Sequence, residues 1–80
     1  MNREIIFKRV QEIFRDVFDE DTLMISDKTS SDDIEDWDSL NHILLLSSIQ
    51  DEFKITISLE EMQSQSNVES LVKIIISKIK

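Results

Sequence analysis

The chain contains no cysteine and no glycine, and each absence excludes a class of functional site. Without cysteine, neither a disulfide framework nor a thiolate zinc site is possible. Without glycine, the phosphate-binding loops of the GxxxxGKS/T and GxGxxG types cannot form, and tight glycine-dependent hairpins are disfavoured. Proline is absent too, and no segment reaches the ~20 consecutive apolar residues of a membrane span. The composition therefore favours helices joined by polar connections.

The length of 80 residues predicts a single domain over residues 1–80. A chain this short buries only about 60% of its unfolded surface, so its core is small. The absence of cysteine fits a reducing compartment, and residues 1–14 mix charged with apolar positions and do not form the apolar region of a signal peptide. We therefore expect a monomeric, cytoplasmic protein without a membrane-inserted segment.

The net charge of −8 is concentrated between residues 19 and 38, where nine acidic residues accompany one lysine. A negative field of this kind repels nucleic acid and anionic membranes, whereas it favours basic protein partners. An EF-hand loop counted from Asp27 needs glycine at its sixth position and glutamate at its twelfth. The chain has Asp32 and Asp38 there, so we predict no specific metal site.

Apolar residues with a period of 3.6 predict a first helix over residues 3–18, with Asn2 as its N-cap. The period is lost over residues 19–37, which form a long connection. Connections of this length in a small domain are usually functional or disordered. Its apolar anchors on the core are expected to be Leu23, Ile25 and Ile34.

A second helix is predicted to begin after Asp38, a preferred N-cap residue, and to end near Phe53. Residues at steps of three or four predict its buried stripe, which comprises Leu40, Ile43, Leu46, Ile49 and Phe53. Leu44 and Leu45 extend the apolar surface beyond one face.

A short helical turn is predicted over residues 59–63, because Ser58 and Glu61 have the spacing of a capping box. The last helix is expected over residues 67–79, where apolar residues again follow the helical period. Three longer helices and one short helix predict an all-α protein, a small four-helix bundle with a long first connection.

Ser39 has two interpretations at the start of the second helix. It is an ordinary helix-start residue, or its exposed hydroxyl is a chemical handle near unpaired backbone N–H groups and the positive end of the helix dipole. A phosphate bound without a covalent bond would need basic residues, and the chain has none between Lys28 and Lys54. A phosphate at this position must therefore be covalently attached.

The residues "DSL", preceded by Trp37 and an acidic run, resemble the motif of the acyl carrier proteins and related peptidyl carrier domains. The resemblance covers essentially the whole chain and implies the acyl-carrier type of bundle. It implies that Ser39 carries 4′-phosphopantetheine, transferred from coenzyme A by a phosphopantetheinyl transferase. The thiol of this arm would hold an acyl or aminoacyl group as a thioester, and the protein itself would have no catalytic residue.

The chain also departs from the family pattern. Acids at Glu35 and Asp36 stand where a glycine often precedes the motif, and Leu44 stands where fatty-acid carriers often have glutamate. These departures predict partner enzymes with basic or mixed basic and apolar docking surfaces, in a specialised biosynthetic pathway rather than housekeeping fatty-acid synthesis. The candidate partner-contact residues are Asp36, Trp37, Asp38, Leu40 and Leu44. Trp37 and Leu40 have a second interpretation, as residues that pack the connection against the bundle.

Two other functions are considered. The main alternative is an acidic helical interaction module without a prosthetic group. A hydrolase based on Ser39 and His42, three residues apart on one helix, is disfavoured because the chain has no GxSxG motif and His42 is expected at the surface. The resemblance leaves the cargo open between the groups of fatty acyl, polyketide, aminoacyl and cell-surface precursor pathways, and it leaves open whether the cargo enters the core.

Overall fold

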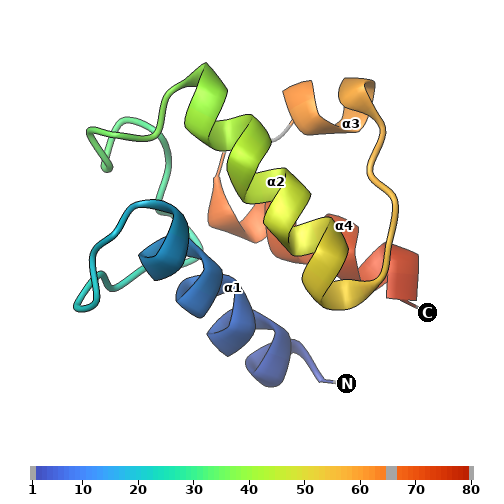
Figure 1. The fold of residues 1–80 in the computed structure, drawn as a ribbon. Helices are drawn as coiled ribbons and strands as arrows, with labels where there is room; N and C mark the ends of the chain where they lie inside the picture. The colour runs from blue at the N-terminus through green and yellow to red at the C-terminus, as the bar shows by residue number, and fades with distance from the viewer. Residues whose placement is uncertain (1, 65–66, 80) are drawn as a thin grey trace.

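The computed structural model describes residues 2–64 and 67–79, which contain four helices (Figure 1). These are α1 (Arg3–Val17), α2 (Ser39–Phe53), α3 (Leu59–Gln63) and α4 (Val68–Ile79). The predicted all-α architecture is confirmed, and the predicted helices begin and end within one residue of the observed bounds. No helix in the described ranges is long and apolar enough to cross a membrane.

The two longest helices begin at side-chain caps that the sequence predicts. The side chain of Asn2 accepts a hydrogen bond from the N–H of Ile5 at 2.9 Å. The Asp38 carboxylate accepts one from the N–H of Asn41, also at 2.9 Å. Because each cap satisfies a backbone N–H that has no partner within the helix, it stabilises a helix start at the next residue.

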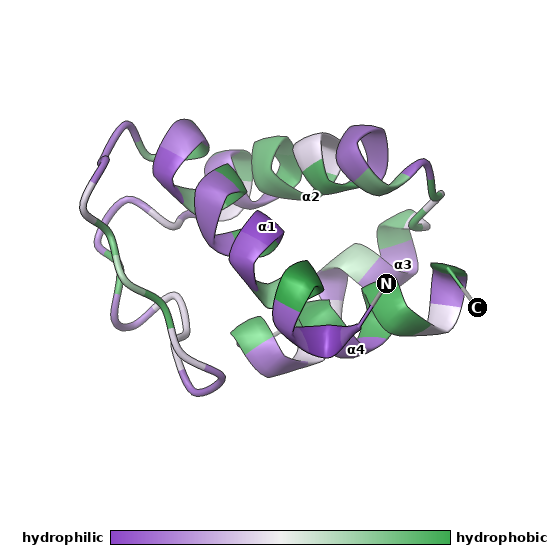
Figure 2. Ribbon diagram, turned by 90° about the horizontal axis from the view of Figure 1, so that it is seen from below, coloured by the Kyte–Doolittle hydropathy of each residue, from purple (hydrophilic) through white to green (hydrophobic). Residues whose placement is uncertain are grey.

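The long connection between α1 and α2 is bound to α1 and α4 at several points. Gln11 accepts a hydrogen bond from the Ile25 N–H at 3.0 Å, and the Val68 N–H at the start of α4 donates to the Thr29 carbonyl at 2.9 Å. Ile25 and Ile34 are each 7% exposed, and Leu23 is half-buried against the core. The predicted anchors are therefore confirmed. Figure 2 shows the connection as mainly hydrophilic, with isolated hydrophobic residues.

The core lies between α1, α2 and α4, with α1 packed against both other helices. Hydrophilic and hydrophobic residues alternate along α1 and α4, as expected for helices with one buried face (Figure 2). The side chains without exposed surface are Val10, Phe14, Leu45, Leu46, Ile49, Val68, Leu71, Val72 and Ile75.

The predicted buried stripe of α2 is wrong in its first half. Leu40 is 67% exposed and Ile43 is 49% exposed, whereas Leu45 and Leu46 are fully buried. Four consecutive apolar residues at positions 43–46 cover about 300° around a helix, so they cannot all face one side. The inward position one turn before Leu45 and Leu46 belongs to His42, not to Ile43.

Leu44 and Leu45 provide a matched pair of substitutions for this inward face. We expect Leu45→Ala to lower the free energy of unfolding by about 2–5 kcal/mol, because it leaves a cavity in the core. Leu44→Ala, at a side chain 49% exposed, should change it by no more than about 0.5 kcal/mol. Urea denaturation followed by circular dichroism measures both values, and equal losses would contradict the assigned orientation of α2.

Candidate functional site

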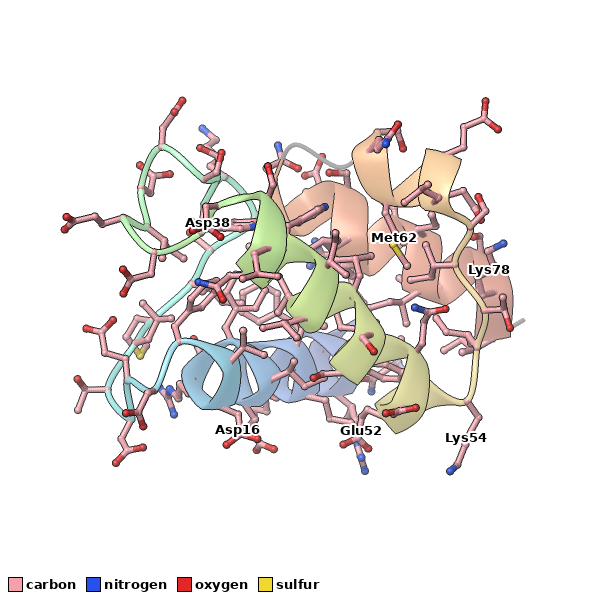
Figure 3. The ribbon with its side chains drawn as sticks, turned by 45° about the horizontal axis from the view of Figure 1, so that its top comes forward. Asp16, Asp38, Glu52, Lys54, Met62 and Lys78 are labelled. Carbon is pink, nitrogen blue, oxygen red and sulfur yellow. The ribbon has the colours of Figure 1, made fainter. Side chains whose placement is uncertain are left out.

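Ser39 is exposed and is the first residue of α2, a helix of 15 residues. Asp38 precedes it as the N-cap, and Figure 3 shows Asp38 at the end of α2 beside the connection. The N–H of Asn41 donates to the Asp38 side chain, and the N–H of His42 donates to the Asp38 carbonyl at 2.8 Å. An anion on the Ser39 hydroxyl oxygen would lie at the positive end of the helix dipole.

The turn that leads into α2 is held by three hydrogen bonds. The Asn41 side-chain amide donates to the Asp36 carbonyl at 2.6 Å, and the Asp38 N–H donates to the same carbonyl at 3.0 Å. The Trp37 N–H donates to the Ile34 carbonyl at 3.1 Å. Because several backbone groups are satisfied locally, the position of the residue after Asp38 is well defined.

Trp37, predicted among the partner-contact residues, lies in the core instead. It is 6% exposed, and its ring meets Phe14 edge-on at a centroid distance of 5.1 Å. It also lies 6.5 Å from the ring of Phe18. Such aromatic contacts stabilise a core by more than the burial of their apolar surface area alone. The interpretation of Trp37 as a packing residue of the connection is therefore the one that its burial supports.

His42 is half-buried and hydrogen-bonded on both sides, so the expectation of a surface histidine is wrong. Trp37 Nε1 donates to His42 Nδ1 at 3.0 Å, and His42 Nε2 lies 2.8 Å from the carbonyl oxygen of Met62 in α3. The Trp37 and His42 rings are stacked, with centroids 5.9 Å apart. Since both ring nitrogens are engaged, His42 is not available as a base for Ser39 in this arrangement.

A hollow of about 530 Å³ lies beside Ser39, between the start of α2 and α3. Its lining includes Trp37, Ser39, His42, Ile43, Leu59 and Met62. Ile43 and Leu59 are 49% and 64% exposed, whereas the Met62 side chain points from α3 into the molecule (Figure 3). The sequence did not predict this hollow, because α2 and α3 meet only in the folded chain.

The other predicted partner-contact residues are exposed. Asp36 and Asp38 lie in the turn before α2, and Leu40 and Leu44 lie one turn apart on the outer side of that helix. We call Leu40, Ile43 and Leu44 the outer apolar strip of α2; their side chains are 67%, 49% and 49% exposed. The first turn of α2 contains no acidic residue, so the negative charge lies before the helix.

The short helix α3 borders the hollow and is held through the backbone N–H and the side-chain carboxylate of Glu61. The predicted capping box is confirmed: the Glu61 N–H donates to Ser58 Oγ at 3.1 Å, and the Ser58 N–H donates to Glu61 Oε1 at 3.0 Å. Lys78 Nζ of α4 lies 3.0 Å from the same carboxylate. The backbone hydrogen bond from Ser58, followed by the hydrogen bond from Lys78, holds the pKa of Glu61 below its ordinary value of 4.5.

Residues 2–64 and 67–79 contain no group of three or more histidine or carboxylate side chains that could hold a metal ion. The acidic residues before α2 are spread along a turn and do not converge on one point.

Comparisons with known proteins relate the chain to a sequence family and to solved structures. The sequence model of the family described as "Phosphopantetheine attachment site" matches residues 8–75. Among solved structures, the holo acyl carrier protein of Geobacter metallireducens is similar to the chain, with a TM-score of 0.85, 36% identity, and coverage of 92% of this chain and 85% of that one. The acyl carrier protein of Thermotoga maritima has a TM-score of 0.85 and 25% identity, with 99% and 92% covered. A search of curated proteins by sequence gives no match.

The lowered pKa of Glu61 predicts how the α3 cap depends on pH. The stabilisation by the ionised carboxylate is present above the unfolded pKa and is lost as the pH falls through the lower folded pKa. A carbon NMR titration of the Glu61 carboxyl should therefore give a midpoint below 4.5, and Lys78→Met should raise it. Lys73→Met, which removes the pair with Glu69 instead, is the matched control and should leave the midpoint unchanged. A Glu61 midpoint at or above 4.5 would contradict the cap geometry.

Proposed function

The chain belongs to the family of phosphopantetheine-binding acyl carrier proteins, and on this premise we propose that Ser39 is the residue to which its prosthetic group is attached. The observation that carries the proposal is an exposed serine hydroxyl at the first position of α2, within the matched residues 8–75. Proteins of this family are carriers and not enzymes. They interact with a phosphopantetheinyl transferase and with biosynthetic enzymes.

The residues around Ser39 fit a covalently attached phosphodiester. The hydroxyl is open to solvent, the helix terminus favours a negative charge, and Ser39 itself lines the hollow, which would leave room for an attached arm. The 4′-phosphopantetheine group, when attached, supplies a terminal thiol that holds an acyl group as a thioester. This chain contains no cysteine, so the thiol has to come from the prosthetic group. The protein supplies the hydroxyl, its orientation and the surface that partners bind.

The surface around Ser39 supports a proposal about the partner enzymes. Asp36 and Asp38 present negative charge before α2, and Leu40 and Leu44 present apolar side chains directly after Ser39. Charge of this kind steers a basic partner, whereas desolvated apolar contacts dominate the binding free energy. We therefore propose docking surfaces of mixed basic and apolar character, and a carrier of a specialised biosynthetic pathway.

Three further expectations belong to the same proposal. The chain acts as a single carrier domain over residues 1–80, as a monomer, and in the cytoplasm; the absence of cysteine supports this last expectation because it fits a reducing compartment. The alternative of an acidic interaction module without a prosthetic group is not favoured, because the family match includes the position of Ser39.

Attachment is tested by incubating the protein with coenzyme A and a promiscuous phosphopantetheinyl transferase, followed by intact mass spectrometry. We expect wild type to gain the mass of one phosphopantetheinyl group and Ser39→Ala to gain none. Ser47→Ala, which removes another exposed serine of α2, is the matched control and should be modified like wild type. An unmodified wild type, with the transferase active on another carrier protein, would contradict the proposal.

The balance between apolar and electrostatic docking is tested with the same transferase. Leu40→Ala should lower kcat/KM for modification about tenfold, the equivalent of about 1.4 kcal/mol, because Leu40 is the exposed apolar side chain next to Ser39. Ile5→Ala, at an exposed isoleucine in the first turn of α1, should have no effect. Asp36→Asn should have a smaller effect that disappears at high salt. A normal rate for Leu40→Ala together with a large loss for Asp36→Asn would contradict apolar docking.

A further inference from the structure

A polar side chain, His42, lies on the buried side of α2 near its start. His42 lies one turn before Leu45 and Leu46, which are fully buried, and is itself half-buried. A polar ring at such a position is unfavourable unless it has hydrogen-bond partners. His42 has two: Trp37 Nε1 at 3.0 Å from Nδ1, and the Met62 carbonyl oxygen at 2.8 Å from Nε2.

These two partners determine which ring nitrogen of His42 carries the proton. An indole N–H can only donate, so His42 Nδ1 accepts from Trp37 and is unprotonated. A carbonyl oxygen can only accept, so Nε2 carries the hydrogen that is donated to Met62. Both hydrogen bonds therefore form together only in the neutral Nε2–H tautomer.

Trp37, His42 and Met62 form a wall between the hollow beside Ser39 and the core. All three line the hollow. Trp37 also belongs to the core, where it contacts Phe14, and Met62 packs against the core from α3. His42 is hydrogen-bonded to each of them, so the wall is continuous from the start of α2 to α3.

We propose that His42 is a specificity-determining residue that keeps the group carried on Ser39 out of the core. The inference rests on the proposed function, because it concerns a cargo attached through Ser39. A hydrocarbon chain that enters the core through this wall separates His42 from Trp37 or from Met62. This separation leaves a half-buried N–H or carbonyl group without its partner, which is unfavourable.

The wall therefore selects cargo by length and polarity. A short or polar acyl group is accommodated in the hollow, whose outer edge is formed by the half-exposed Ile43 and by Leu59. A long fatty acyl chain gains less there than in the core, because the hollow is bordered by exposed side chains and part of the chain stays in contact with water. The chain is thus a carrier of short or polar acyl groups, with His42 as the residue that excludes long ones.

The test compares two cargoes on the same protein. The transferase is supplied with acetyl-coenzyme A or octanoyl-coenzyme A, and loading is verified by intact mass. We expect the two loaded forms of wild type to have the same Tm, with amide shift differences limited to the lining of the hollow. In His42→Ala, the octanoyl form should melt higher than the acetyl form by on the order of 5 °C, and the amides of core residues such as Leu46 and Ile75 should shift.

Two further variants test whether exclusion of the octanoyl chain depends on the hydrogen bonds of His42. Ile5→Ala, at an exposed isoleucine of α1 that does not line the hollow, is the matched control and should behave like wild type. His42→Gln retains one donor and one acceptor and should restore exclusion of the octanoyl chain. Nitrogen NMR of the wild-type ring tests the network even where a variant does not fold: it should show that the neutral ring carries its hydrogen on Nε2 and not on Nδ1. The opposite tautomer overturns the proposal.

The remaining outcomes are also decisive. A higher Tm of octanoyl-loaded than of acetyl-loaded wild type overturns the proposal, because the chain then enters the core past an intact His42. A His42→Ala variant whose two loaded forms stay alike overturns the role of His42. A wild type that accepts neither group overturns the proposed function itself, and this result is visible at the loading step, before any comparison of cargo.

Discussion

The start of α2 is the constraint on which both the fold and the site depend. The Asp38 carboxylate caps the helix through the N–H of Asn41, and the ring of Trp37, one residue earlier, packs edge-on against Phe14. The buried tryptophan determines where the connection ends, and the cap determines where the helix begins. Ser39 is therefore held between an anchored residue and a helix, with its hydroxyl exposed at the positive end of the dipole.

The two sides of α2 serve different purposes. Its inner side, with Leu45, Leu46 and other fully buried residues, holds the bundle together, whereas the outer apolar strip is in contact with solvent. The negative charge that would steer a partner lies mainly in the connection before the helix, beyond the strip. A partner that approaches Ser39 thus meets acidic side chains on one side of the serine and apolar ones on the other.

The short helix α3 is held mainly by polar contacts at its ends. None of its residues is fully buried, and it is tied to its neighbours by the capping box, by Lys78 and by the His42 side chain. Elements with few buried apolar groups open at a lower free energy than the core. The wall beside Ser39 combines the packing of Trp37 and Met62 against the core with the two hydrogen bonds of His42, so a single histidine joins its two packed parts.

By itself, the sequence determined the four helices, the N-caps of the first three and the exposed serine, because caps and a 3.6-residue period depend on neighbours along the chain. It did not determine which of residues 43–46 turn inward, since apolar residues in a row fit either side of a helix and only packing against the rest of the bundle distinguishes them. Tertiary structure also decided the roles of Trp37 and His42. Phe14, which packs against Trp37, and Met62, which is hydrogen-bonded to His42, are distant in the sequence, so neither the burial of the tryptophan nor the hydrogen bond of the histidine to α3 follows from local pattern.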